Sequence, residues 1–188
     1  MPQEAPYLGQ GCASPYSRGE LARRLAWQVV QGSLFRWSPR PCHGFRARLL
    51  RLFGADIAAP GSVVVFPTVQ VEFPWKLTLA PRAMLGRRVI VYNPARITLA
   101  RGANVSQHVH LCAGSHDYRK WSMPLIAGPI AIGENAWIAA DVFVGPGVTI
   151  GAYSVVGARS VVMRDLPAYK VCVGNPCRPV SDRESPQP

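Results

Sequence analysis

A period of six residues runs through the second half of the chain, and it restricts the fold more than any other feature of the sequence. Aliphatic residues recur at every sixth position, and the residue after five of the six is glycine or alanine. This period fits neither the turn of an α-helix nor the two-residue alternation of a hairpin strand. It fits a coil with flat sides of about six residues, each of which points one aliphatic residue inward. The uninterrupted series is Ile132, Ile138, Val144, Ile150, Val156 and Val162.

The series continues upstream with a two-residue shift in one place, and a weaker version occupies residues 57–75. Each aliphatic side chain buried in such a stack contributes about 1.5–3 kcal/mol. The repeats therefore predict an all-β solenoid domain over residues 54–180, followed by a flexible tail at 181–188. The upstream positions are Leu79, Leu85, Val91, Leu99, Val105 and Leu111, preceded by Ile57, Val63 and Val69.

One segment does not fit the repeat. Leu111 and Ile132 are 21 residues apart, three more than a three-sided coil of 18 residues would place between them. We therefore expect residues 115–129, SHDYRKWSMPLIAGP, to leave the coil as an external loop.

Residues 1–53 predict a short, basic helical region. Ser17 and Glu20 have the spacing of a capping box, and Leu21, Leu25 and Val29 then recur at helical spacing. A second helix is expected over FRARLLRLFG, with Gly54 as its C-terminal cap. Residues 1–16 are rich in proline, glycine and serine and are expected to be loose. The predicted faces of the second helix are Phe45, Leu49, Leu52 and Phe53 on one side, and Arg46, Arg48 and Arg51 on the other.

The chain is strongly basic. Lysine and arginine total 21 against 10 acidic residues, a net charge of +11, and eight of the arginines lie in residues 1–53. This charge fits a solvated basic face, a phosphorylated ligand or an anionic membrane surface. Nucleic acid is the least favoured partner, because the sequence has no helix-turn-helix, zinc-finger, RNP or KH pattern.

Cysteine usage and hydropathy favour a cytoplasmic protein. The five cysteines are an odd number without CxxC spacing, which argues against a disulfide framework and against a cysteine zinc site. No run of 18 apolar residues is present, and the first residues lack the basic and apolar parts of a signal peptide.

Two groups of motifs resemble a known family. The hexads followed by SVVMRDLPAYKVCVGNPCRPV resemble the hexapeptide-repeat acyltransferases of the maltose, galactoside and nodulation-factor O-acetyltransferase branch. The blocks WSPRPCHGFRARLLRLFGA, VYNPARITLARGANVSQHVHLCAGSHDY and AWIAADVFVGPGVTIG are similar to acetyltransferases assigned to colanic acid biosynthesis. The resemblance implies a left-handed parallel β-helix and a homotrimer with active sites between subunits. It also implies acetyl-CoA as co-substrate and a sugar hydroxyl as acceptor.

The resemblance also assigns roles to individual residues. His116 aligns with the family's catalytic histidine, in the block L-x-x-x-x-H that begins at Leu111. A histidine suits a base that takes a proton from an alcohol and passes it to a thiolate. No GxSxG motif suggests a covalent acyl-enzyme, so direct transfer is expected. The expected cofactor-binding residues are Trp137, Ala140, Ala158, Arg164 and Arg178, and the expected acceptor-binding residues are Asn93 and Asp117.

The sequence leaves several roles of these residues, and two other functions, open. His108 and His110 are expected to be structural or to lie at a subunit interface, and Asp117 fits a structural role as well as acceptor binding. Trp137 fits packing of the coil, and Arg164 and Arg178 fit a solvated surface. A γ-type carbonic anhydrase, with zinc held by three histidines, and a non-catalytic hexapeptide scaffold are the alternative functions. The SHD loop and the GNPCRP ending favour the transferase, for which no metal is expected.

The basic N-terminal region has two candidate roles. Arginines beside aromatic and aliphatic residues suit an interfacial helix, which would dock on the cytoplasmic face of a membrane carrying a lipid-linked oligosaccharide acceptor. The competing interpretation is that the helices cap the open end of the prism and bury the same apolar residues. Both can hold, because a capping helix can present its arginine face to lipid.

Overall fold

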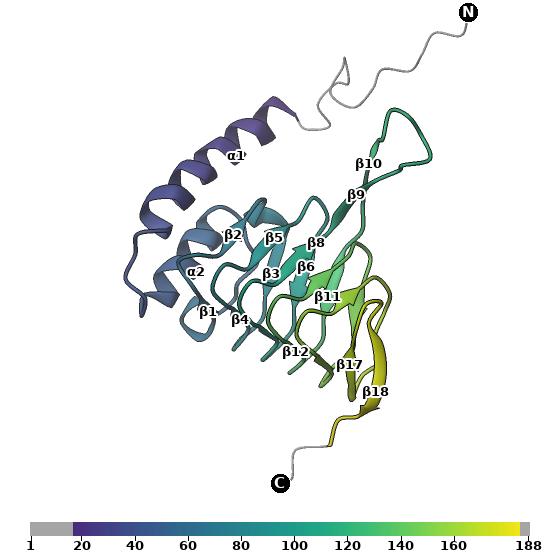
Figure 1. The fold of residues 1–188 in the computed structure, drawn as a ribbon. Helices are drawn as coiled ribbons and strands as arrows, with labels where there is room; N and C mark the ends of the chain where they lie inside the picture. Colours follow the sequence, from purple (N-terminus) through teal and green to yellow (C-terminus); the bar gives the residue numbers. More distant parts are fainter. Residues whose placement is uncertain (1–16, 185–188) are drawn as a thin grey trace, which may run out of the picture.

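The computed structural model describes residues 17–184, which form a β-solenoid with helices at its N-terminal end (Figure 1). Helix α1 spans Arg18–Val30 and continues into the π-helical turn η1, Gln31–Phe35, and α2 follows at His43–Leu52. Ser17 caps α1 as predicted, because its hydroxyl accepts a hydrogen bond from the Glu20 N–H at 3.2 Å. The segment 1–16, expected to be loose, lies outside the described residues.

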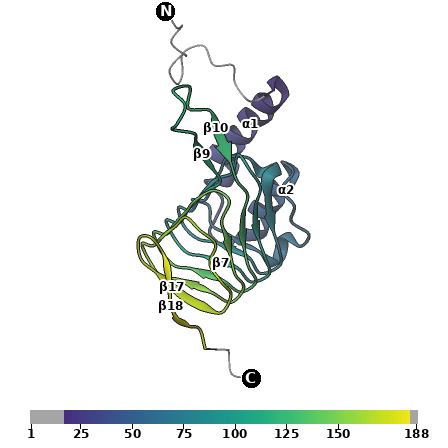
Figure 2. The same ribbon diagram turned by 90° about the vertical axis from the view of Figure 1, so that its right-hand side faces the viewer.

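Three parallel sheets form the faces of the solenoid, and the chain visits them in rotation (Figure 2). Sheet 1 contains β1 (Val64–Val65), β4 (Met84–Leu85), β7 (Asn104–Val105), β12 (Trp137–Ile138), β15 (Val155–Val156) and β17 (Lys170–Val173), with β18 (Arg178–Asp182) added antiparallel. Sheet 2 contains β2 (Gln70–Val71), β5 (Ile90–Tyr92), β8 (His110–Cys112), β13 (Phe143–Val144) and β16 (Val161–Val162). Sheet 3 contains β3 (Leu77–Leu79), β6 (Ile97–Leu99), β11 (Ile130–Ile132) and β14 (Thr149–Ile150). Below, the turns from sheet 1 to sheet 2 are called the 1–2 corner, and those from sheet 2 to sheet 3 the 2–3 corner.

The aliphatic ladder fills the solenoid as the six-residue period predicts. In sheet 1, Leu85, Val105, Ile138 and Val156 stand in register on successive strands, and all four are completely buried. Because each side chain stacks on its equivalent in the next coil, the strands share one continuous apolar core. The prediction of a left-handed parallel β-helix with a short helical N-terminal region is confirmed.

The register of the first coil differs from the expectation. Val63 and Val69 are buried, but β1 and β2 pair with the next coil through strands that end at Val65 and Val71. Two short 3-10 helices interrupt this part of the chain, η2 at Pro60–Ser62 and η3 at Pro74–Lys76. Each 3-10 helix lengthens its side of the coil by two residues. The inward-facing positions of β1 and β2 are therefore Val65 and Val71 in place of Val63 and Val69.

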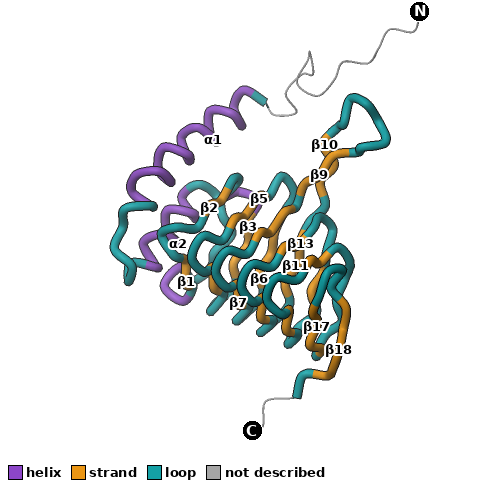
Figure 3. Tube along the Cα trace, viewed as in Figure 1, coloured by secondary structure: helices purple, strands orange, loops and turns teal. Residues whose placement is uncertain are grey.

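Residues 115–129 leave the solenoid as predicted (Figure 3). Strands β9 (Gly114–His116) and β10 (Leu125–Ala127) pair antiparallel, and the hairpin they form projects away from the coils. The hairpin connects β8 of sheet 2 to β11 of sheet 3, so Leu111 and Ile132 are one side apart and not a full coil apart. The insertion is therefore larger than the three residues that the spacing suggested.

The helices seal the open edge of the first coil, which supports the capping interpretation. The outermost strand of a sheet leaves backbone groups without partners. At β2, the Trp27 indole N–H donates to the Val71 carbonyl at 2.6 Å, and the Gln31 side chain accepts from the Val71 N–H at 2.7 Å. At β1, the Arg46 guanidinium donates to the Val65 carbonyl at 2.6 Å. The edges of both strands thus find their donors and acceptors in the helical region.

The buried face of α2 is not the one that its sequence pattern predicts. Arg46 is completely buried although it was assigned to the exposed arginine face, and Leu52 is 78% exposed although it was assigned to the apolar face. The physical reason is the demand for hydrogen-bond donors at the first coil. The Arg46 guanidinium donates to the Ser38 hydroxyl at 2.8 Å and to the carbonyls of Pro39 and Arg40 at 2.8 and 2.6 Å. It therefore ties the loop before α2 to the solenoid.

The C-terminal strand runs past the boundary expected at residue 180. Strand β18 pairs with β17 as far as Asp182, which forms an ion pair with Lys170. Ser181 and Asp182 thus belong to a strand and not to a flexible tail, while residues 185–188 lie outside the described part. The division into a helical region, 1–53, and a solenoid, 54–180, stays a prediction. Across residues 17–184, no helix combines the length and the apolar character needed to cross a bilayer.

Candidate active site

His116 ends strand β9, where the loop of the external hairpin begins, and one of its ring nitrogens is fixed by the backbone. Its Nδ1 is 2.6 Å from the carbonyl oxygen of Met123, in the loop that connects β9 to β10. A carbonyl oxygen only accepts hydrogen bonds, so Nδ1 carries the proton and the neutral imidazole keeps its lone pair on Nε2. The side chain is partly exposed. This is the tautomer that a general base needs.

A set of hydrogen bonds holds the Met123 carbonyl in place. The Asp117 N–H donates to the Pro124 carbonyl at 3.0 Å, and the Met123 N–H donates to the Lys120 carbonyl at 2.8 Å. The Asp117 carboxylate accepts from the Nε–H and the backbone N–H of Arg119 at 3.1 and 3.2 Å. These bonds, above all the one from the Arg119 side chain, lower the pKa of Asp117. Asp117 therefore stabilises the turn that carries the Met123 carbonyl.

Ala140 and Ala158 stack on successive coils of the 1–2 corner. The Arg159 N–H donates to the Ala140 carbonyl at 2.9 Å, and the Asp141 N–H donates to the Gln107 carbonyl of the preceding coil at 3.1 Å. The corner is thus a regular ladder of turns. Because alanine has no side-chain atom beyond Cβ, this part of the ladder leaves room along its outer surface for an extended ligand.

Trp137 borders the same corner from strand β12. Its indole N–H donates to the Ser106 hydroxyl at 3.0 Å, and the side chain is 45% exposed, so part of the ring faces outward. Arg178 begins β18 at the C-terminal end of sheet 1, and its guanidinium donates to the Cys177 carbonyl at 3.1 Å. Arg164 follows β16 at the 2–3 corner and is exposed. Both guanidinium groups are thus near the C-terminal end of the solenoid.

The site residues expected from the sequence fall on opposite edges of sheet 2. Strands β8 and β13 are parallel neighbours. Ala140 precedes β13, whereas His116 follows β8, so the two residues lie beyond opposite ends of this strand pair. Trp137 and Ala158 lie on the same edge of sheet 2 as Ala140, and Arg164 lies on the same edge as His116. A single chain therefore does not bring the candidate base and the candidate coenzyme surface together.

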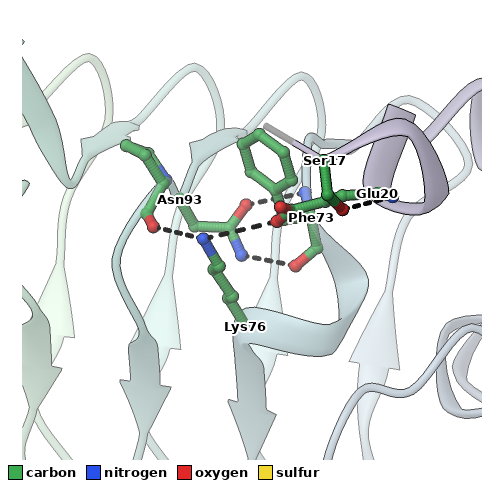
Figure 4. A network of polar contacts seen from close by, with 6 residues as sticks. Ser17, Glu20, Phe73, Lys76 and Asn93 are labelled. Carbon is green, nitrogen blue, oxygen red and sulfur yellow. Dashed lines mark hydrogen bonds and ion pairs between the residues drawn. The ribbon is translucent and has the colours of Figure 1, made fainter. Parts of the chain in front are cut away.

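Asn93 has a structural position in place of the expected contact with an acceptor (Figure 4). It is completely buried, its Nδ2 donates to the Phe73 carbonyl at 2.8 Å, and its Oδ1 accepts from the Phe73 N–H at 2.9 Å. Both ends of the amide are used to hold the preceding coil. Beside it, the Lys76 ammonium donates to the Pro94 carbonyl at 2.7 Å and lies 3.8 Å from the Glu20 carboxylate. This network joins α1 to the solenoid.

The other two solenoid histidines have local partners. His108 Nδ1 lies 3.3 Å from the Asp141 carboxylate at the 1–2 corner. His110 meets the Phe143 ring edge-on in sheet 2, with ring centroids 5.4 Å apart, and burial lowers its pKa, which favours the neutral form. Nowhere in residues 17–184 do three His, Cys, Asp or Glu side chains gather closely enough to hold a metal ion.

A hollow beside the 1–2 corner was not among the features that the sequence patterns singled out. It has a volume of about 620 Å³ and is lined by Arg40 together with residues of the first three coils. The adjacent arginines Arg87 and Arg88 were a signal for it, because two basic residues interrupt the repeat at one corner. Arg40 carries no such signal, since it reaches the hollow from the loop before α2.

Comparison with known proteins agrees with this architecture. Residues 129–164 match the sequence profile of the family described as bacterial transferase hexapeptide (six repeats). A protein of Escherichia coli (strain K12), provisionally named colanic acid biosynthesis acetyltransferase WcaF, is 48% identical over 165 residues, which cover 88% of this chain and 90% of the relative. The chain belongs to the hexapeptide-repeat acetyltransferases.

Solved hexapeptide acetyltransferases have the same fold over nearly the whole chain. The structure of the hexapeptide-repeat acetyltransferase VCA0836 of Vibrio cholerae O1 biovar eltor, complexed with acetyl coenzyme A, superposes with a TM-score of 0.79 at 27% identity and covers 95% of this chain and 96% of its own. A maltose O-acetyltransferase from Clostridium difficile 630 superposes with a TM-score of 0.78 over 90% of each chain at 24% identity, which shows the fold alone.

Proposed function

We propose that this acetyltransferase moves an acetyl group from acetyl-CoA to a sugar hydroxyl in exopolysaccharide biosynthesis, with His116 as the general base. The observation that carries the proposal is the Met123 carbonyl at His116 Nδ1, because it leaves Nε2 able to take a proton. The relative WcaF is named for colanic acid biosynthesis, and the Vibrio cholerae relative was solved with acetyl coenzyme A. Both names support the choice of acceptor and donor.

The transfer is direct. His116 Nε2 takes the proton of the acceptor hydroxyl while the hydroxyl oxygen attacks the carbonyl carbon of the thioester. The C–S bond then breaks, the sulfur leaves as a thiolate, and the imidazolium returns the proton to that sulfur. The products are an acetylated sugar and free CoA. Main-chain N–H groups of a neighbouring coil are the candidates for stabilising the oxyanion of the intermediate.

The acyl donor is expected along the 1–2 corner, past Ala140 and Ala158. Their small side chains suit the pantetheine arm, and the exposed part of the Trp137 ring borders the same surface. Arg178 would pair with the nucleotide phosphates from the same chain, and Arg164, which lies on the His116 edge, would do so from the neighbouring subunit, because guanidinium recognises phosphate through paired hydrogen bonds.

The separation of His116 from this corner favours a homotrimer. In such an assembly, the His116 edge of one subunit would face the 1–2 corner of the next, and each active site would take residues from both. Analytical ultracentrifugation of the full chain with acetyl-CoA is expected to give a trimer. A monomer that binds acetyl-CoA tightly would contradict the arrangement.

The substitution His116→Ala tests the proposed base. It is expected to lower kcat for acetyl transfer by about 10²–10⁴, the usual contribution of a general base, without changing the affinity for acetyl-CoA. Ser115→Ala is the matched control, because Ser115 is the exposed neighbour on the same strand. Retention of near-full activity by the His116 variant, with the polysaccharide precursor of the producing cell as acceptor, would remove this mechanism.

The helical region also supports the proposal that the enzyme binds peripherally to the cytoplasmic face of a membrane that carries its acceptor. Leu21, Leu25 and Val29 form an exposed stripe along α1, and Trp37 is 82% exposed beyond it. Exposed apolar residues beside arginines suit an anionic lipid surface. Flotation of the full chain is expected with anionic vesicles and not with neutral ones. Equal recovery with both would leave the capping role alone.

A further inference from the structure

The hollow at the 1–2 corner has the composition of an anion-binding site. Three arginines and a histidine line it, and hydroxyl and amide side chains stand between them. No carboxylate is among the residues that line it. Its volume of about 620 Å³ lies in the range of small-molecule sites. The lining residues are Arg40, Phe66, Thr68, Met84, Gly86, Arg87, Arg88, Ser106, Gln107 and His108.

Contacts with the first coil and with the loop before α2 position the three arginines, and none of the three forms an ion pair with a carboxylate in residues 17–184. Arg87 lies over the Phe66 ring at 5.6 Å, and the Arg88 N–H donates to the Thr68 hydroxyl at 2.9 Å. Arg40 sits in the loop that the buried Arg46 fastens to the first coil.

One carboxylate lies near this group of basic residues without lining the hollow. The Asp141 carboxylate is 3.3 Å from His108 Nδ1 and forms no ion pair with any of the three arginines. Three arginine residues therefore line one hollow, and none of its lining residues carries a carboxylate. An anionic ligand bound there would be attracted by three positive charges, and no carboxylate of the lining would compete with it.

The position of the hollow connects it to the proposed chemistry. The His108 N–H donates to the Arg87 carbonyl at 2.9 Å, and the Asp141 N–H donates to the Gln107 carbonyl at 3.1 Å. Arg87, Gln107 and Ala140 thus occupy equivalent places on successive coils of the same corner. At about 4.8 Å per coil, the arginines lie about 10 Å from Ala140, on the side away from Ala158. An acceptor bound there would lie beyond the end of the corner surface expected for the acyl donor.

We propose that this hollow binds the diphosphate group of the acceptor, so that the enzyme acetylates a sugar that is still attached to its diphosphate carrier. The inference rests on the proposed function and names the substrate class of that site. A diphosphate offers two or more negative charges and several acceptor oxygens, which suit the paired N–H donors of three arginine side chains. A lipid diphosphate and a nucleoside diphosphate present this same group, and binding experiments separate the two sources.

Titration calorimetry with inorganic pyrophosphate tests the site directly. The full-length protein is saturated with CoA beforehand, so that the nucleotide phosphate site cannot bind the probe. We expect saturable binding to the wild type and a dissociation constant at least about tenfold higher for Arg88→Asn and for Arg87→Gln. Each variant loses one guanidinium group and its charge-assisted hydrogen bonds to phosphate. Asparagine is chosen at position 88 because it tolerates the positive φ of 55° found there.

Arg82 provides the matched control. It is an exposed arginine on the same coil, with a φ of 64°, at the corner between sheets 3 and 1. Arg82→Asn removes the same charge from the same type of turn and is expected to leave pyrophosphate affinity unchanged. An equal loss in Arg82→Asn and Arg88→Asn, or no binding to the CoA-saturated wild type, would overturn the proposal. The affinity of each variant for CoA reports whether it is folded.

Two further ligands decide between the sources of the diphosphate. Uridine diphosphate glucose represents the nucleotide-linked sugars, and glucose joined through diphosphate to farnesol represents the lipid-linked ones. Tighter binding of either over glucose, lost in Arg88→Asn, supports the proposal and identifies the carrier. Glucuronate binding as tightly as either would overturn it in favour of a carboxylate site. Pyrophosphate binding at Arg88 without any acetyl transfer would refute the proposed function and leave the anion site standing.

Discussion

Replacing Arg46 with methionine is expected to destabilise the protein and loosen the loop that carries Arg40. Arg46 is completely buried between α2 and the first coil. Its guanidinium serves three main-chain carbonyls and a hydroxyl, those of Val65, Pro39, Arg40 and Ser38. Methionine fills a similar volume but donates no hydrogen bond, so all four acceptors lose the hydrogen bond from Arg46.

The size of the effect follows from these contacts. A carbonyl that loses its donor inside a protein costs about 1–3 kcal/mol. The contacts to Pro39 and Arg40 are only partly buried, so the lower end of this range applies, and the three carbonyls together cost about 3–5 kcal/mol. Burial lowers the pKa of Arg46, chiefly through desolvation, which shows that the charge itself is held at a cost that methionine removes. We therefore expect a net loss of about 2–4 kcal/mol in the free energy of unfolding. For a chain of this size the loss corresponds to a fall in Tm of about 6–12 °C.

Urea denaturation at fixed protein concentration measures the loss, and Arg48→Met is the control because Arg48 is an exposed residue on the same helix. Its unfolding free energy is expected to change by less than about 0.5 kcal/mol. The Arg46 variant is also expected to bind pyrophosphate more weakly while its affinity for CoA is unchanged. Equal unfolding free energies for the two variants would refute the role assigned to Arg46.

Two further predictions concern titratable groups of sheet 2 and the hairpin. Asp117→Ala is expected to lower kcat by about tenfold and to alter the pH dependence of kcat/KM, because the turn that fixes His116 Nδ1 loses its carboxylate anchor; Asp117→Asn, which keeps an acceptor oxygen, is expected to restore most of the rate. Unchanged pH profiles for both variants would limit Asp117 to stability. The lowered pKa of His110 means that the unfolded chain takes up a proton that the folded one resists, so stability should be constant above pH of about 6.5 and fall as the pH decreases below it. Urea midpoints measured between pH 7 and pH 5 should fall less steeply in His110→Gln than in the wild type, and equal slopes would contradict this.

The solenoid was predictable because one physical requirement repeats. Each inward position must be aliphatic, and residues such as Ile138 and Val156 meet this requirement every eighteen residues on the same sheet. The lengths of the sides were less predictable. The 3-10 helices η2 and η3 add residues without changing composition, so the register at Val65 and Val71 could be read only from the strand pairing.

The sequence pattern could not predict the buried polar side chains, for a different reason. A helical pattern assigns Arg46 to the solvent face because it counts charge and spacing, and it does not register that the edge of the first coil needs donors. The position of Asn93 illustrates the same limit, since an amide that looks available to a sugar is consumed by the backbone of Phe73.

The candidate site was predictable only in part. His116 came from a block that resembles a family, whereas its partner Met123 lies in a hairpin turn with no repeat to place it. Arg40 lines the hollow at the 1–2 corner together with Arg87 and Arg88, which are more than forty residues away along the chain. Tertiary contacts bring them together, and no local pattern contains that information.

The separation of the two edges of sheet 2 leads to a test by subunit complementation. His116→Ala removes the proposed base, and Ala158→Trp fills the corner surface expected for the coenzyme, at an exposed position. Each variant alone should be nearly inactive. Suppose that every site takes its base from one subunit and its corner from the next. In a trimer assembled at random from equal amounts of both variants, the first subunit has an intact base with a probability of one half, and the next has an intact corner with a probability of one half. About one quarter of all sites are then intact. Co-expression of two differently tagged variants should therefore restore about one quarter of the wild-type activity. A site built within one subunit could not be restored in this way, because every subunit would lack either the base or the corner, so activity of the mixed trimers that stays at the level of the separate variants would refute the shared site.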